Sequence, residues 1–324
     1  MKLIISFFKG AVLFLPLLVR AQHETEIIRF SSANPFSLND IIKEIDELPT
    51  QEVFGKLTLP NDSLSSDQKF PLIIGVAGSM DWREHHLEYM QMYQDAGFAT
   101  FELQSFASRN IASTVGSQDQ TTIAALILDA YRALDALAKH PAIDRERIAL
   151  TGWSLGGGVS LFSGWLPVVE AIAPQNRFAA HLAFYPPCFF NLQATDFTQA
   201  PIHILIGGAD DWTPATPCNA LVEQLSEKAN IQLTIYDNAH HGFDSTLPVV
   251  ENPDGYSFKD CMFDLTPEGD VLMNYLRLPM SNPTMQKLGF LFCVEKGVHI
   301  GGNPEARNAS FQFAKAFMLE HLSL

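Results

Sequence analysis

Apolar residues follow two different patterns along this chain, and the two patterns alternate between residues 53 and 236. Short continuous apolar runs, such as 71–77, are typical of strands that are buried on both faces of a sheet. Longer stretches, such as 121–140, place apolar residues at helical spacing and end at a proline or glycine. Strands are predicted at 53–59, 71–77, 98–103, 148–151, 178–185, 202–206 and 231–236. Helices are predicted at 84–96, 121–140, 217–229 and 307–324, with a short one near 38–47.

Strands that alternate with helices favour a mostly parallel central sheet flanked by helices, which is the α/β class. Ligands of such sheets bind at the carboxyl ends of the strands. Loops that begin near residues 78, 154, 210 and 241 all follow predicted strands at such ends. We therefore expect the functional site to be assembled from these loops.

The length and composition fit one folded domain. The chain has 324 residues, and its 47% hydrophobic and 18% charged content supplies enough apolar material for a single large core. Residues 22–50 are mixed in pattern, and residues 245–300 break the alternation with many turn-forming residues. We expect a single domain over 22–324, with 245–300 as an insertion that caps the site.

The first 21 residues have the pattern of a secretory signal peptide. Lys2 and Lys9 precede an apolar run at 10–19, and Ala21 places a small residue at the cleavage position. This run is too short to cross roughly 30 Å of membrane hydrocarbon, so no stable membrane anchor is expected. The sequence predicts removal of residues 1–21 and export, either to the periplasm or out of the cell.

Charge and cysteine usage narrow the range of partners. The formal net charge is −15 and no Lys/Arg-rich run occurs, so nucleic acid is not an expected partner. No cysteines are spaced as a Cys-x-x-Cys zinc pair, so no metal is expected. Four cysteines in an exported protein favour two disulfides, and sequence order suggests Cys188–Cys218 and Cys261–Cys293. Four buried free thiols are the alternative.

A serine stands at the junction between a predicted strand and a predicted helix. Residues 152–156 read Gly-Trp-Ser-Leu-Gly. A serine on so tight a turn has a strained backbone and needs very small residues two positions away on either side, which the glycines supply. The turn raises the Ser154 hydroxyl above the sheet edge and aims the amide of Leu155 at a developing oxyanion. Ser154 is therefore the candidate nucleophile, with a bystander serine in a glycine-rich turn as the alternative.

A serine nucleophile needs a base within hydrogen-bond reach and a carboxylate that orients this base. With a strand–turn–helix serine, the order along the chain is serine, then acid, then histidine. Asp210 and Asp211 follow one predicted strand, and His240 and His241 follow the next. Either member of each pair could serve on this reasoning alone.

Residues 53–244 and the last helix resemble the dienelactone hydrolase family of α/β-hydrolases. The resemblance rests on three motifs, which are Gly-Trp-Ser-Leu-Gly-Gly at 152–157, Gly-Gly-Ala-Asp-Asp-Trp-Thr-Pro at 207–214, and Ala-His-His-Gly-Phe-Asp at 239–244. Family members have Gly-x-x-Asp before a proline, and histidine before a small residue and phenylalanine, which implies Asp210 and His241. The resemblance also implies the α/β-hydrolase fold. The name-giving members use cysteine where this chain has serine, so an esterase is implied rather than an enzyme for dienelactone itself.

Further positions follow from the same resemblance. A run Ser-Phe-Ala-Ser-Arg that ends at Arg109 is similar to a family motif, which implies that Arg109 holds a substrate carboxylate or pairs with an acid on the surface. Where the family has His-Gly in its first oxyanion loop, this chain has Ala-Gly, so the second oxyanion donor is the amide of Ser79 or Gly78. Cys188 and Cys218 also recur as a pair in secreted relatives.

The residues together predict a serine hydrolase that cleaves carboxylic ester or lactone bonds through a Ser-His-Asp triad and an acyl-enzyme, without a cofactor. Its partner would be a small-molecule ester or lactone. Trp153 and Trp212 are expected to border the pocket and favour an apolar or aromatic group, or else to be ordinary packing aromatics. A peptidase or amidase with the same triad, and a non-catalytic binding protein of the same fold, are the alternatives.

Overall fold

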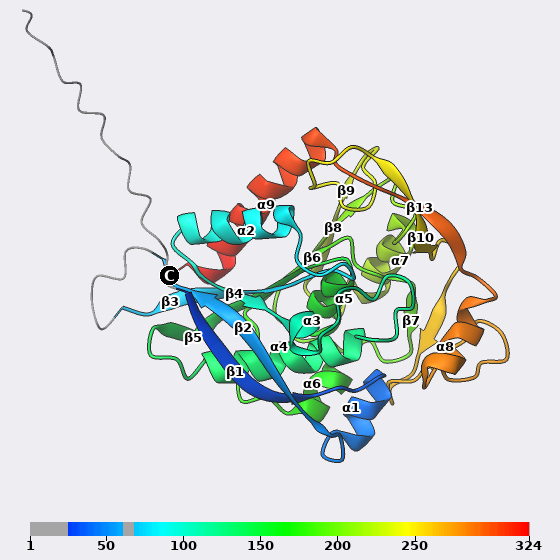
Figure 1. Cartoon of the computed structure of the whole chain (residues 1–324), viewed down its shortest axis with the longest axis horizontal. Helices are drawn as coiled ribbons and strands as arrows, with labels where there is room; N and C mark the ends of the chain where they lie inside the picture. The colour runs from blue at the N-terminus through cyan, green and yellow to red at the C-terminus, as the bar shows by residue number, and fades with distance from the viewer. Residues whose placement is uncertain (1–24, 61–67, 324) are drawn as a thin grey trace, which may run out of the picture.

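The central strands of the sheet are the apolar runs of the sequence. The computed structural model describes residues 25–60 and 68–323. Within these residues, eight strands form one sheet in the order β1-β2-β4-β3-β5-β6-β8-β9 (Figure 1). Its parallel part consists of β4 (Ala99–Leu103), β3 (Phe70–Val76), β5 (Ile143–Trp153), β6 (Ala180–Phe184), β8 (Ile202–Gly207) and β9 (Ile231–Tyr236). The prediction of a mostly parallel sheet flanked by helices is confirmed.

An antiparallel edge extends the sheet beyond β4. β1 (Thr25–Ala33) pairs with β2 (Thr50–Thr58), and β2 pairs with β4. The mixed pattern of residues 22–50 did not predict β1. Most residues of this strand are exposed or half-buried, as is usual at a sheet edge, so no apolar alternation marks it.

Helices cover both faces of the sheet. α2 (Glu84–Asp95) packs beside α9 (Pro304–Leu322) on one face, while α4 (Ile123–Leu137) packs with α1 (Leu38–Glu44) and α5 (Leu155–Phe162) on the other (Figure 1). The other helices of the described chain are α3 (Ser105–Ser108), α6 (Leu166–Ile172), α7 (Ala215–Leu225) and α8 (Pro283–Phe290). α6 was not predicted, because an apolar segment of seven residues shows no reliable helical period.

Local capping explains where the predicted helices begin and end. The Thr122 side chain accepts a hydrogen bond from the amide of Ala125, so α4 begins at Ile123. α2 ends just before Gly97, whose φ of +92° lies in the left-handed region that glycine adopts without strain. These two helices frame the loops that follow β3 and β4.

Residues 245–300, here called the added segment, fold into small sheets and a helix beside the carboxyl ends of the parallel strands. β10 (Val250–Ser257) pairs with β13 (Glu295–Ile300), and β11 (Phe263–Leu265) pairs with both β12 (Val271–Leu272) and β7 (Phe190–Leu192). Their buried side chains form a second apolar cluster, which also takes in Phe189 and Trp212 from the loops after β6 and β8. The segment is therefore attached to the loops in which the functional site was expected.

Within the described residues, no helix is long and apolar enough to cross a membrane. The predicted signal peptide, residues 1–21, lies outside the part of the chain that the structure describes. Two disulfides occur among the described residues, Cys188–Cys218 and Cys261–Cys293. This is the pairing that sequence order suggests, and it points to an oxidising compartment.

Candidate active site

Ser154 occupies the turn between β5 and α5, and its backbone is strained. Its φ of 56° and ψ of −113° place a residue with a side chain in a region that usually requires glycine. Two backbone hydrogen bonds hold the turn, from the Ser154 amide to the Phe184 carbonyl and from the Gly158 amide to the Ser154 carbonyl, each 2.9 Å long. Strain that the surrounding structure maintains in this way is typical of functional sites.

The two glycines of the turn are required by close backbone contacts. A Cβ atom at Gly152 would lie 2.1 Å from the carbonyl oxygen of Gly156, and one at Gly156 would lie 2.1 Å from that of Val76. Both distances are far below van der Waals contact. The strand, the turn and the first residues of α5 can therefore pack this closely only without side chains at these positions.

The structure brings Ser154, His241 and Asp210 together in one hydrogen-bonded series. His241 Nε2 lies 2.9 Å from Ser154 Oγ, and His241 Nδ1 lies 2.8 Å from Asp210 Oδ2. Asp210 follows the end of β8, and His241 lies in the loop after β9. Both side chains are almost fully buried. The chain order and the distances match those that a serine, base and acid require.

The neighbouring candidates point elsewhere. Asp211 accepts hydrogen bonds from the backbone amide of His299, at 2.8 Å, and contacts its ring Nδ1 at 2.7 Å. The ring of His240 lies beside that of His299, with 5.6 Å between the ring centroids. Asp211 and His240 therefore belong to a contact between the added segment and the strand-end loops, not to the series that contains Ser154.

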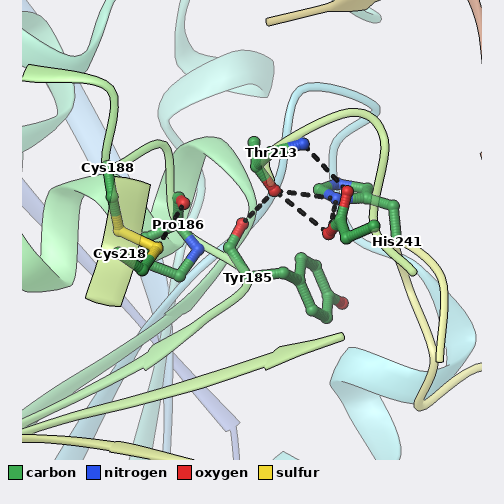
Figure 2. The surroundings of a disulfide bond; sticks show 7 residues. Tyr185, Pro186, Cys188, Thr213, Cys218 and His241 are labelled. Carbon is green, nitrogen blue, oxygen red and sulfur yellow. Dashed lines mark hydrogen bonds and ion pairs between the residues drawn. A yellow bond between two sulfur atoms is a disulfide. The ribbon is translucent and has the colours of Figure 1, made fainter. Parts of the chain in front are cut away.

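Two backbone amides fix the orientation of Asp210. The amides of Trp212 and Thr213 donate to Oδ1 at 2.9 and 2.8 Å, which leaves Oδ2 facing His241. The Thr213 hydroxyl lies 3.1 Å from Asp210 Oδ2, from His241 Nδ1 and from the carbonyl oxygen of Tyr185 (Figure 2). Sequence reasoning did not assign this threonine. Its position just before Pro214, at the start of α7, was the only signal available.

Tyr185 packs against the ring of His241, and sequence reasoning did not assign it to the site either. Its ring meets that of His241 edge-on at 4.7 Å between centroids, and its hydroxyl donates to Asp244 Oδ1 at 2.9 Å. Burial, and then the charge of Asp244, raise the pKa of Tyr185 well above 10, so the hydroxyl remains a donor. The sequence signal was a Tyr-Pro-Pro run directly after a strand.

The two predicted oxyanion donors flank the serine. Leu155 is the first residue of α5, so its amide has no partner within the helix. Ser79 lies in the loop after β3, where its carbonyl oxygen accepts from the amide of Thr114 at 2.9 Å and from the hydroxyl of Ser113 at 3.0 Å. The preceding Gly78 passes over the serine, since a Cβ there would lie 3.4 Å from the Ser154 Cβ. These contacts hold the loop beside Ser154.

Two hollows meet at Ser154, and Ser79 and Trp212 also line both. The first has a volume of about 170 Å³ and is lined largely by phenylalanine and aliphatic side chains. The second has a volume of about 630 Å³ and includes several charged side chains. The expectation that Trp212 borders the site agrees with this arrangement.

Two expected substrate contacts are corrected by the structure. Trp153 is completely buried and stacks on His86 and Phe184, at 4.6 and 5.4 Å between centroids, so its ring lies in the core and lines neither hollow. Arg109 forms a two-pronged ion pair with the buried Asp129, at 2.7 and 3.1 Å. Its guanidinium is almost fully buried, which leaves it unable to hold a substrate carboxylate.

The described residues contain no cluster of side chains suited to binding a metal ion. No group of three or more His, Cys, Asp or Glu side chains is placed there to hold an ion.

The helix-flanked parallel sheet and the serine turn at its edge define an α/β-hydrolase fold. The model of the dienelactone hydrolase family matches residues 89–257, which is just over half of the chain and includes Ser154, Asp210 and His241. The chain belongs to the dienelactone hydrolase family. No curated protein matches the sequence.

Solved structures with a similar fold include hydrolases of several kinds. An esterase from Thermogutta terrifontis, solved with butyrate bound, has a TM-score of 0.50 and 16% identity, over 63% of this chain and 84% of the esterase. A protein from Bacteroides ovatus, assigned as a dipeptidyl aminopeptidase IV, has a TM-score of 0.50 and 15% identity, over 68% of this chain and 34% of its own. A protein from Klebsiella pneumoniae subsp. pneumoniae, assigned as a dienelactone hydrolase, has a TM-score of 0.49 and 16% identity, over 68% of this chain and 89% of its own. At these identities the likeness to the first two, whose TM-scores are 0.50, shows the fold alone.

Proposed function

We propose that this chain is a serine hydrolase that cleaves carboxylic ester or lactone bonds through an acyl-enzyme. The observation that carries the proposal is the buried hydrogen-bonded series of Ser154, His241 and Asp210, with distances of 2.9 and 2.8 Å. The strained backbone of Ser154 supports its role as nucleophile. Membership of the dienelactone hydrolase family supports the hydrolytic class.

In the first step, Ser154 Oγ attacks the substrate carbonyl carbon while His241 Nε2 accepts the serine proton. Asp210 accepts a hydrogen bond from Nδ1–H and stabilises the imidazolium that forms. The carbonyl oxygen becomes an oxyanion, which we assign to the backbone amides of Leu155 and Ser79. Each such donor is worth roughly 3 kcal/mol of transition-state stabilisation.

In the second step, His241 donates its proton to the leaving alcohol oxygen as the bond between this oxygen and the carbonyl carbon breaks. Water then attacks the acyl-enzyme, with His241 as the base that accepts its proton. The carboxylic acid leaves and Ser154 regains its hydrogen. This sequence balances without any cofactor or metal.

The motif residues provide matched controls for a test. We expect Ser154→Ala and Asp210→Asn to reduce the hydrolysis of p-nitrophenyl acetate by at least about a thousandfold. Asp211→Asn and His240→Gln change the adjacent residues of the same motifs, whose side chains face His299, and should stay within a few-fold of the unaltered enzyme. Equal losses in the Asp210 and Asp211 variants would exclude the assigned acid.

A label for active serines separates catalysis from simple binding. A fluorophosphonate should modify the unaltered protein at Ser154 and should not modify the Ser154→Ala variant. A protein that only binds ligands would react in neither form. The same triad also allows a peptidase or amidase, and the fold relative from Bacteroides ovatus is assigned as an aminopeptidase. Turnover of an amide with the same acyl group as the best ester tests this alternative.

We also propose that the protein is exported after removal of residues 1–21, and that residues 22–324 form one domain with 245–300 as a cap. The two disulfides support an oxidising compartment. The apolar cluster shared by the added segment with Phe189 and Trp212 supports a cap attached to the main domain. Sequencing the amino terminus of the protein recovered from cells tests the cleavage position. Limited proteolysis tests whether the cap separates.

A further inference from the structure

The two hollows at Ser154 differ sharply in the side chains that line them. Among the described residues that line the first hollow, none is ionisable. The second hollow includes Asp81, Arg83, His85, Glu88 and Glu251. A substrate that reaches Ser154 through both would therefore place chemically different groups on the two sides of its scissile bond.

The apolar hollow has room for about one aromatic ring. Its volume of about 170 Å³ is close to the roughly 150 Å³ of an apolar cavity that holds benzene. Phe162 and Phe189 line it from the main domain, and Phe258, Phe263 and Phe290 line it from the added segment. Aromatic walls of this kind favour a compact aromatic or branched apolar group.

The larger hollow suits a neutral polar group. Carboxylates outnumber guanidinium groups in its lining, and one of them, Glu88, is paired with Arg307. Carboxylate oxygens act as acceptors, so they bind hydroxyl donors and disfavour an anionic ligand. Burial is the main cause of a raised pKa at Asp81 and a lowered pKa at His85, so the surroundings of both groups disfavour their charged forms.

The position of the histidine decides which side of the ester lies in which hollow. His241 lines the larger hollow and is absent from the lining of the apolar one. The leaving alcohol must receive its proton from His241 Nε2, so the alcohol oxygen has to lie on the side of the larger hollow. Leu155 lines only the apolar hollow. The acyl group, which stays on Ser154 after the alcohol leaves, therefore belongs there.

We infer that the substrate is an ester of a compact apolar carboxylic acid, of about the size of a benzoyl group, with a larger neutral polyol. The inference rests on the proposed function, since it uses Ser154 as nucleophile and His241 as proton donor. The Ser154 Oγ–acyl bond forms, the bond from the acyl carbon to the polyol oxygen breaks, and the polyol leaves with the proton from His241. Water completes the cycle.

Two constitutional isomers test the orientation directly. Glyceryl 1-benzoate carries the ring on its acyl side and the hydroxyl groups on its alcohol side, and benzyl glycerate reverses them. We expect kcat/KM for glyceryl 1-benzoate to be at least tenfold higher. Equal values, or a preference for benzyl glycerate, would overturn the inference.

The same measurement separates failure of the inference from failure of the proposed function. Turnover of p-nitrophenyl acetate without turnover of either isomer would overturn the substrate class and leave the serine hydrolase intact. No turnover of any ester, together with no fluorophosphonate label at Ser154, would overturn both.

Substitutions in each hollow provide a second test that does not use benzyl glycerate. Val271 is half-buried and lines the apolar hollow, so Val271→Trp should lower the ratio of glyceryl benzoate to glyceryl acetate turnover about tenfold or more. Thr246 is exposed and lines the larger hollow, so Thr246→Trp should lower the ratio of glyceryl benzoate to methyl benzoate turnover. Leu291→Trp adds the same side chain at an exposed position outside both hollows and should change neither ratio. Identical ratios in all three variants would contradict the assignment of the hollows.

Discussion

The hydroxyl oxygen of Thr213 lies 3.1 Å from His241 Nδ1, the same ring nitrogen that Asp210 Oδ2 contacts at 2.8 Å. The hydroxyl is also 3.1 Å from Asp210 Oδ2 and from the carbonyl oxygen of Tyr185. A hydroxyl donates one proton and accepts through two lone pairs. Its one proton goes to either Asp210 Oδ2 or the Tyr185 carbonyl oxygen, and its oxygen can accept from His241 Nδ1–H. Thr213 is therefore one buried group in contact with the proposed acid, the proposed base and the end of β6.

Removing this hydroxyl should impair turnover more than folding. We expect Thr213→Ala to lower kcat by about ten- to a hundredfold, because a hydrogen bond to a charged group is worth roughly 1.5 to 3 kcal/mol and about 1.4 kcal/mol corresponds to a factor of ten. Thr213→Ser retains the hydroxyl and should recover most of the rate. Steady-state kinetics of the two variants, with thermal unfolding as a control, check this. Equal rates for the alanine and serine variants would show that the hydroxyl has no part in the reaction.

The site was largely predictable because its signals are local. Ser154, with the glycines around it, and the aspartate and histidine motifs each lie directly after an apolar strand, and parallel strands bring such ends to one edge of a sheet. The choice of Asp210 over Asp211 came from the resemblance to a family. The structure brings the same residue to His241.

The two corrected residues show what local signals omit. Neighbouring residues of a strand point to opposite faces, so Trp153, next to Ser154 at the end of β5, turns into the core against His86. Arg109 forms its ion pair with Asp129 of α4, a helix that was predicted only from the spacing of its apolar residues. β11 pairs with β7 across more than sixty intervening residues. Each strand has only three residues, which is too short for a periodic pattern that would predict the pairing.

The two disulfides should contribute similarly to the stability of the folded protein and differ in their effect on turnover. Their sequence separations are 30 and 32 residues, so loop closure gives about 3 to 4 kcal/mol for each. Cys188–Cys218 joins the segment that follows Tyr185 to α7, and the hydroxyl of Thr213, just before α7, contacts the carbonyl oxygen of Tyr185 (Figure 2). Replacing both Cys188 and Cys218 by alanine should lower kcat as well as the melting temperature.

Cys261–Cys293 lies in the apolar cluster of the added segment together with Phe258, a wall of the apolar hollow. Replacing both cysteines of this pair by alanine should raise KM for esters with a bulky acyl group, while kcat for p-nitrophenyl acetate falls less than in the other double variant. Melting temperatures and the two kinetic constants of both double variants check this. A common kinetic change in both would indicate general loosening of the fold instead.

Buried histidines should make the protein sensitive to mild acid. Burial lowers the pKa of His181 and His203 to about 4, and it also lowers the pKa of His85 and His86. The folded state keeps these rings neutral, whereas the unfolded chain binds protons near pH 6.5. The unfolded state therefore holds more protons between pH 6.5 and 4, and stability must fall as the pH decreases through that window. Melting temperatures at pH 7.5 and 5 measure the loss.

Two histidine variants should change this pH dependence in opposite directions. His203→Gln removes a ring whose pKa is lowered in the folded state, so its melting temperature should fall less between pH 7.5 and 5. His299 has a raised pKa because its ring hydrogen-bonds to Asp211, so its protonation favours the folded state in mild acid. His299→Gln should therefore make the acid-induced fall slightly steeper. Parallel curves for both variants and the unaltered protein would refute the linkage.

The serine turn should tolerate no side chain at Gly152, because a Cβ atom there would lie 2.1 Å from the carbonyl oxygen of Gly156 and the backbone cannot yield without moving Ser154. We expect Gly152→Ala to cost several kcal/mol, to lower the melting temperature by on the order of 10 °C, and to reduce kcat/KM at least a hundredfold. Gly116→Ala makes the same chemical change where nothing lies within 4 Å of the added carbon. Its melting temperature and turnover should stay close to those of the unaltered protein. Calorimetry gives the melting temperature of each variant, and ester hydrolysis gives its kcat/KM. Equal values for the two variants would show that the serine turn can accommodate a side chain at Gly152.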